Sequence, residues 1–180
     1  QIRIANIILK NLPNVSGADA TKERIKGEAL AMRAYGYFML TQIYAKRYEV
    51  GGANTHPGVP LRLDDSFDPI PRSTVAEVYT SINSDLAQSY TLLDGKPRSN
   101  KSHFNSNVVR GLMARVALVQ GKYPEAATYA KEARTGFALM TNAQYKSGFN
   151  SYAVSEWMWG YSPIDLTSDY FGNFMAYMSR

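Results

Sequence analysis

The chain has 180 residues, of which 45% are hydrophobic and 19% are charged, and it contains no cysteine. This length and composition fit one globular domain with its own core, or a piece of a larger one. They exclude a disordered chain, a disulfide scaffold, a cysteine-ligated zinc site and a cysteine nucleophile. The net charge of +5 is compatible with nucleic acid, but the basic residues are dispersed along the sequence, and we therefore expect no nucleic-acid partner.

Two helices are predicted at the start of the chain. Pro13 ends a short first helix, whose apolar face would carry Ile4, Ile7, Ile8 and Leu12. A longer helix is predicted over about residues 21–47, because apolar residues recur every three or four positions and no proline interrupts them. Its inner face is expected to carry Ile25, Ala29, Met32, Phe38, Leu40 and Ile43.

A segment rich in proline and glycine, residues 48–73, follows the long helix and predicts an irregular insert. Connections of this length are often functional or held down by other parts of a fold. Its aspartates, Asp64, Asp65 and Asp68, favour a solvated loop, with a calcium site as the alternative. His56 and His103 are expected to be loop residues, and we predict no metal site.

Three further helices are predicted. One begins at Thr74 and Glu77, which form a capping-box pair, and its inner face would carry Val75, Val78, Tyr79, Ile82, Leu86 and Leu93. After a polar stretch over residues 94–106, a fourth helix ends at Gly121. A fifth begins at Pro124, and its inner face is expected to carry Ala126, Ala130 and Ala133.

The two helices between Asn107 and Arg134 have the small-residue spacing of a tetratricopeptide-like hairpin, with an arbitrary amphipathic hairpin as the alternative. The helices over about 21–47 and 74–93 form an earlier, stretched hairpin around the insert. We therefore expect a mainly α fold, with a tetratricopeptide-like scaffold over residues 1–137 that contains the insert at 48–73. Stacked repeats normally present a surface to a partner.

Aromatic residues gather in the last segment, residues 138–180. Trp157 and Trp159 follow a predicted strand over 154–156, and we interpret both as core residues. The alternative is a platform on which sugar rings stack, with polar side chains taking the hydroxyls. For Tyr170, Phe171 and Tyr177, which stand among Ser, Asp, Asn and Gly, the sequence leaves both interpretations open.

Five stretches carry a family pattern: GEALAMRAYGYF at 27–38, PGVPL at 57–61, PRSTVAEVY at 71–79, the hairpin at 107–133 and SEWMWG at 155–160. In this order and spacing they resemble the SusD/RagB family of outer-membrane nutrient-binding lipoproteins of Bacteroidetes. The resemblance covers nearly the whole chain, and it implies a SusD-like α–α superhelix with no catalytic activity and no cofactor.

The resemblance also implies partners and a location. Members of the family lie at the cell surface, anchored in the outer membrane by a lipidated N-terminal cysteine, and they deliver oligosaccharides, or peptides in some members, to a SusC-like TonB-dependent transporter. Because the chain lacks cysteine and members run to several hundred residues, we expect a central fragment, with the lipid anchor absent from this chain and the C-terminal lobe missing.

The segment after Trp159 is where a family member would begin to contribute ligand loops. The residues expected to bind ligand are Tyr161, Tyr170, Phe171, Asn173 and Tyr177. The rival hypothesis is a tetratricopeptide-type protein-interaction scaffold in which all aromatics are core. An enzyme ranks third, because the sequence holds no Gly-x-Ser-x-Gly elbow and no phosphate-binding glycine loop.

Overall fold

A computed structural model describes residues 1–148 and 153–160. In these ranges the regular elements are α1 (Ile2–Asn11), the 3₁₀ turn η1 (Leu12–Asn14), α2 (Asp19–Tyr44), α3 (Val75–Leu93), α4 (Ser106–Val119), α5 (Tyr123–Ala133) and α6 (Asn142–Lys146). No strand forms there, and one isolated antiparallel bridge joins Pro57 to Thr74. The prediction of a mainly α fold is confirmed. No helix in the described ranges is both long and apolar enough to span a bilayer.

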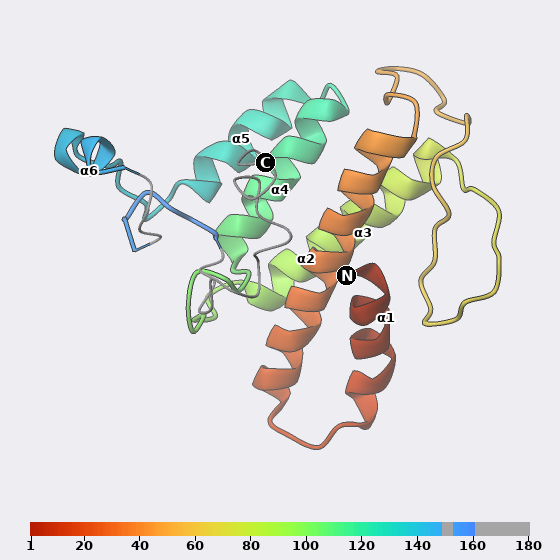
Figure 1. Ribbon diagram of the computed structural model, residues 1–180, viewed down its shortest axis with the longest axis horizontal. Coiled ribbons are helices and arrows are strands. Elements are labelled where there is room, and N and C mark those ends of the chain that lie inside the picture. The colour runs from red at the N-terminus through yellow and green to blue at the C-terminus, as the bar shows by residue number, and fades with distance from the viewer. Residues whose placement is uncertain (149–152, 161–180) are drawn as a thin grey trace, which may run out of the picture.

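The helices pack as successive neighbours (Figure 1). α1 and α2 run side by side and are joined by the short turn at one end, α2 packs along α3, and α4 and α5 form a tight hairpin that contacts α3 through α4. The predicted capping box is present at the start of α3, where the Glu77 amide donates to Thr74 Oγ1 and the Thr74 amide donates to Glu77 Oε2.

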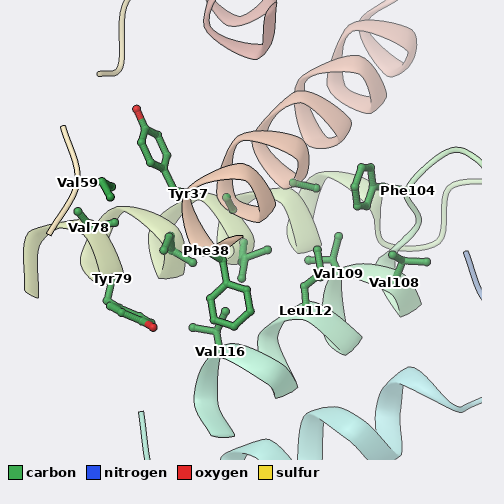
Figure 2. Packing of buried hydrophobic residues seen from close by; sticks show 14 of the residues in the cluster. Tyr37, Phe38, Val59, Val78, Tyr79, Phe104, Val108, Val109, Leu112 and Val116 are labelled. Atoms are coloured by element: carbon green, nitrogen blue, oxygen red, sulfur yellow. The ribbon is translucent and has the colours of Figure 1, made fainter. Parts of the chain in front are cut away.

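One hydrophobic core lies between α2, α3 and α4 (Figure 2). Phe38 of α2 points towards Val116 of α4, and Tyr79 of α3 lies beside them. Each such side chain stabilises the fold by roughly 1.5–3 kcal/mol when it is withdrawn from water. The buried residues at the centre of this core are Ala31, Ala34, Tyr37, Phe38, Val75, Val78, Tyr79, Ile82, Leu86, Val109 and Val116.

Several predicted inward positions are wrong. Ile4 is 62% exposed and Ile43 is 64% exposed, because α1 turns Ala5 and Asn6 towards α2, and Ile43 sits near the uncovered end of α2, which stops at Tyr44 rather than 47. Ala126 and Ala133 are buried as predicted, whereas Ala130 faces outwards. Residues 154–156 form bends and turns rather than the predicted strand.

The insert closes on itself at its base. The Gly58 amide donates to the Ser73 carbonyl at 2.7 Å, the Ser73 amide donates to the Val59 carbonyl at 3.1 Å, and Val59 is buried in the core. A Cβ on Gly58 would lie 2.9 Å from the Ser73 carbonyl oxygen, so only glycine permits this close approach. The insert is therefore an irregular but anchored segment.

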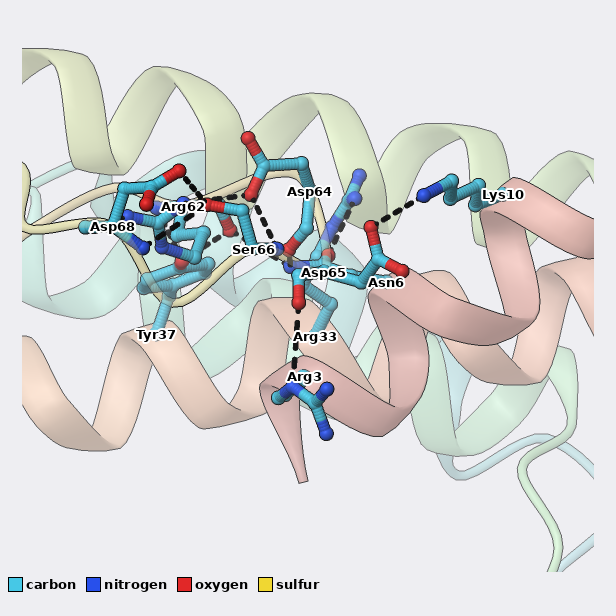
Figure 3. Close-up of polar contacts among 10 residues, drawn as sticks. All are labelled: Arg3, Asn6, Lys10, Arg33, Tyr37, Arg62, Asp64, Asp65, Ser66 and Asp68. Carbon is cyan, nitrogen blue, oxygen red and sulfur yellow. Dashed lines mark hydrogen bonds and ion pairs between the residues drawn. The ribbon is translucent and has the colours of Figure 1, made fainter.

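The tip of the insert is fastened to α1 and α2 by a polar network (Figure 3). The Tyr37 hydroxyl donates to the Arg62 carbonyl at 2.6 Å and accepts from the Arg62 amide at 2.7 Å. Asn6 Nδ2 donates to the carbonyls of Arg62 and Asp64, at 3.0 and 2.7 Å. Asn6 is buried because it satisfies the backbone of the insert rather than because it belongs to an apolar face.

Two of the three aspartates of the insert, Asp64 and Asp65, are paired with cations. Asp65 accepts from Lys10 at 2.7 Å, Asp64 accepts from Arg62 at 2.7 Å, and these hydrogen bonds hold the pKa of both carboxyl groups below the usual value. No group of three or more His, Cys, Asp or Glu side chains within the described residues is arranged to hold a metal ion. The loop expected to be solvated is thus exposed at Asp64, but Asp65 attaches it to α1. The alternative prediction, a calcium site at these aspartates, gains no support.

Candidate functional site

The described chain ends against the loop that precedes α4. The Gly160 amide donates to the Lys101 carbonyl, and Trp159 Nε1 donates to the Ser102 carbonyl, both at 3.1 Å. Lys101 Nζ donates in return to the Val154 carbonyl at 2.6 Å. The residues predicted to bind ligand, Tyr161, Tyr170, Phe171, Asn173 and Tyr177, lie outside the described residues. The last described residue before them, Gly160, is held at the loop over residues 100–104.

Trp159 joins an aromatic cluster at this loop. Its ring lies 4.8 Å from the Phe104 ring and 5.5 Å from the Tyr35 ring, the latter edge to face. Trp159 packs against the hydrophobic core, as its interpretation as a core residue predicts, although part of its side chain stays exposed. Trp157 is half-buried and lies beside Gly160. Aromatic packing of this kind makes the loop a firm wall.

A groove of about 440 Å³ opens beside this wall, between α1, α2 and the loop. Its sides are mainly aliphatic. The residues that line it are Gln1, Ile4, Ala5, Ile8, Arg24, Ile25, Glu28, Ala29, Met32, Ser102, His103 and Phe104. Ile4 and Ile8, predicted as inward residues of α1, thus form one side of an open groove. Grooves with apolar walls and a few convergent polar groups are the usual form of a small-ligand site.

Glu28 is the polar centre of the groove. Its Oε1 accepts from Arg24 Nη1 and its Oε2 contacts His103 Nδ1, both at 2.7 Å. Because a carboxylate only accepts, Nδ1 carries the proton, and in the neutral imidazole Nε2 is then an acceptor. His103 is a loop residue, as predicted. Its pairing with Glu28 was missed, since no local spacing connects residues that are 75 positions apart.

The described residues of the groove carry the chemistry of a binding surface. Hydrolysis of a glycosidic bond usually requires two carboxyl groups about 5–9.5 Å apart. Among the described residues that line the groove, Glu28 supplies the one carboxylate, and each of its oxygens has one hydrogen-bond partner. The aliphatic walls are instead complementary to the C–H faces of a sugar ring, while Arg24 and His103 provide polar contacts.

A second, more polar groove of about 570 Å³ follows the outer face of α3. One side is formed by Leu61 and Leu63 of the insert, and the other by short polar side chains of α3 such as Thr80 and Ser84. None of the described residues that line it is aromatic. It is separate from the aromatic loop, and it is the competing location for a ligand on the described part of the chain.

Comparisons with known proteins agree on one family. Residues 1–118 match a SusD-like family model described as starch-binding associating with outer membrane. A SusD-like carbohydrate binding protein from Bacteroides vulgatus is 30% identical, with a TM-score of 0.81 over 90% of this chain and 35% of its own. A SusD superfamily protein from Bacteroides thetaiotaomicron is 26% identical, with a TM-score of 0.79 over 88% of this chain and 36% of its own.

A laminarin-binding SusD-like protein is 26% identical, with a TM-score of 0.62 over 78% of this chain and 29% of its own. The chain thus spans roughly a third of the length of these solved relatives. No curated protein matches the sequence.

Proposed function

The chain belongs to the SusD-like family, and from this premise we propose that it captures an oligosaccharide at a bacterial cell surface without cleaving it. The observation that carries the proposal is the groove between α1, α2 and the 100–104 loop, which combines aliphatic walls with the Arg24–Glu28–His103 group. The solved structures similar to this chain include proteins named for carbohydrate binding and for laminarin binding.

The groove is proposed as one part of the ligand site. The Gly160 amide donates to the Lys101 carbonyl, in the same loop that carries His103 and Phe104 of the groove. The predicted contacts of Tyr161, Tyr170, Phe171, Asn173 and Tyr177 would then add stacking rings and an amide to the apolar walls. Affinity would come from ring packing and hydroxyl hydrogen bonds.

Non-catalytic capture is supported by the lining of the groove. Glu28 has no second carboxylate beside it among these residues, and its hydrogen bonds to Arg24 and His103 engage both of its oxygens. Glycoside hydrolysis usually uses a pair of carboxyl groups, one as acid and one as base or nucleophile. Glu28 in this arrangement orients its neighbours instead.

The proposal includes delivery to a SusC-like TonB-dependent transporter by a protein that is lipid-anchored in the outer membrane. An exposed apolar surface at the turn between α4 and α5 suits such a contact. Leu118 and Tyr123 are 57% and 63% exposed, and Val50, at 61%, packs directly on Gly121 between them. Contiguous exposed apolar surface is typical of sites that contact another protein. The tetratricopeptide-like hairpin of α4 and α5 would carry it.

Calorimetric titration tests the proposal with two panels, one of neutral and acidic polysaccharides and one of peptides. Saturable binding of a glycan whose chain length is unchanged after overnight incubation is the expected result. Binding of peptides alone would replace glycan capture with peptide capture. Shortened glycan products would identify an enzyme, and binding of neither panel would favour the protein-interaction scaffold.

A further inference from the structure

The walls of the groove are poor neighbours for bare sugar hydroxyls. Ile4, Ile8, Ile25 and Met32 offer no hydrogen-bonding atoms apart from a weakly accepting thioether. A hydroxyl directed at them would leave water without gaining a partner, which is unfavourable. A methyl group in the same place would displace water from apolar surface at no such penalty. The walls therefore suit a sugar that carries a methyl-bearing substituent.

The polar atoms that remain unused define that substituent further. Each Glu28 oxygen already accepts one hydrogen bond, so the carboxylate chiefly orients Arg24 and His103. Arg24 uses Nη1 for Glu28, and no second hydrogen bond joins it to the described residues, which leaves it guanidinium donors. In its neutral form, with Nδ1–H directed at Glu28, His103 presents Nε2 as an acceptor. Arg24 and His103 thus bring donors and an acceptor to the aliphatic surface of the groove.

An acetamido group has the complementary set: a carbonyl oxygen, an N–H and a methyl group. We infer that the groove accepts the acetamido substituent of an N-acetylated hexosamine, with Arg24 donating to its carbonyl, His103 accepting from its N–H and the isoleucines of α1 surrounding its methyl group. This inference rests on the proposed glycan capture and names the substrate class at that site. It assigns Arg24 and His103 a role in specificity.

The test compares two neutral trisaccharides that differ at the C2 substituent of each ring, N,N′,N″-triacetylchitotriose and cellotriose, by titration calorimetry with the purified chain. The acetylated ligand is expected to bind at least about tenfold more tightly, since it gains hydrogen bonds and a buried methyl group. Equal binding, or tighter binding of cellotriose, overturns the inference and leaves glycan capture intact. If neither trisaccharide binds while another unacetylated glycan does, the inference fails as well. If no glycan of any kind binds, the proposed function itself fails.

Two variants test whether Arg24 causes the preference for the acetylated trisaccharide. Arg24→Met keeps an aliphatic stem but removes the donors, and it is expected to reduce the preference for the acetylated ligand to less than about threefold. Lys26→Met, which removes an exposed charge from the same helix outside the groove, is the matched control and should keep the full preference. Unchanged discrimination in Arg24→Met, with a melting temperature equal to that of the control, would overturn the assignment.

Discussion

Arg33 of α2 and Asp85 of α3 form a two-pronged ion pair in the interior, with Nε 2.7 Å from Oδ2 and Nη2 2.8 Å from Oδ1. The side chains are 11% and 4% exposed. Arg33 also donates to Asn6 Oδ1 at 3.1 Å, and Asn6 in turn binds the backbone of the insert (Figure 3). This pair therefore connects α3, α2, α1 and the insert in one chain of hydrogen bonds.

Replacing Asp85 with alanine should lower the free energy of unfolding by about 3–5 kcal/mol, because it leaves the Arg33 guanidinium buried without a counter-charge. Urea denaturation measures the change. Asp94→Ala, at the exposed C-terminal end of the same helix, is the control and should change stability by less than about 0.5 kcal/mol. A loss below about 1 kcal/mol in Asp85→Ala would show that the pair does not hold the helices together.

Two glycine substitutions should have opposite effects. A Cβ on Gly27 of α2 would lie 2.7 Å from Leu93 Cγ, and the Gly27 carbonyl accepts from Ser89 Oγ at 2.7 Å, so Gly27→Ala is expected to force α2 and α3 apart and cost about 1–3 kcal/mol. Gly111 of α4 has open space around it, and Gly111→Ala should stabilise the chain by roughly 0.5–1 kcal/mol. Thermal denaturation of both variants checks the pair, and melting temperatures that shift in the same direction would contradict it.

Arg110 holds the α4–α5 hairpin against α3 through stacking. Its guanidinium carbon lies 3.6 Å from the ring centre of Tyr90 and 4.9 Å from that of Tyr129, and Nε is 2.8 Å from Glu132 without the alignment of a hydrogen bond. Arg110→Lys keeps the charge but loses the planar contact, and about 1 kcal/mol of stability should be lost. Arg115→Lys, on an exposed arginine 5.9 Å from Phe38, is the control. Equal stability of the two variants would argue against a stacking role.

Alkaline pH should destabilise the fold through Tyr79. Burial raises its pKa to about 12, from a usual value of 10, although Gln42 donates to its hydroxyl at 2.6 Å. Because the unfolded chain releases this proton first, the stabilisation is complete below pH 10 and is lost as the pH rises towards 12. Stability measured between pH 9 and 12 should therefore fall less steeply in Tyr79→Phe than in the parent. Tyr123→Phe, on an exposed tyrosine, should follow the parent, and coincident curves for all three proteins would contradict the argument.

Local signals in the sequence predicted the helices well. The Thr74–Glu77 capping box and Pro13 each mark a boundary through contacts within a few residues, and such contacts are visible in a short window of sequence. α6 was missed, although Thr141 and Gln144 form the same kind of capping box at its start. The capping box is a local signal for a helix, but the aromatic composition of residues 138–180 pointed to a segment without one.

Contacts between residues far apart in the chain could not be predicted from the sequence. Asn6 reads as a polar interruption of an apolar face, and it is buried because the backbone of the insert, more than 50 residues away, needs its donor. The pairing of Glu28 with His103 is of the same kind. Periodicity also placed Ile4 inside, whereas it lines a groove. A helical repeat fixes spacing along a face, but which face is covered depends on the neighbouring helices.

We propose that a glycan binds intact in the groove beside the 100–104 loop. The most direct test is an NMR titration of the isotope-labelled chain with an oligosaccharide that binds in calorimetry. Shifts of the protein amide signals report where the ligand binds, and the ligand signals report any cleavage. We predict shifts concentrated at residues 24–32 and 101–104, no change at α5, and ligand signals that keep their chain length. Shifts along the outer face of α3 near Thr80 and Ser84, or the appearance of shorter sugars, would contradict the account.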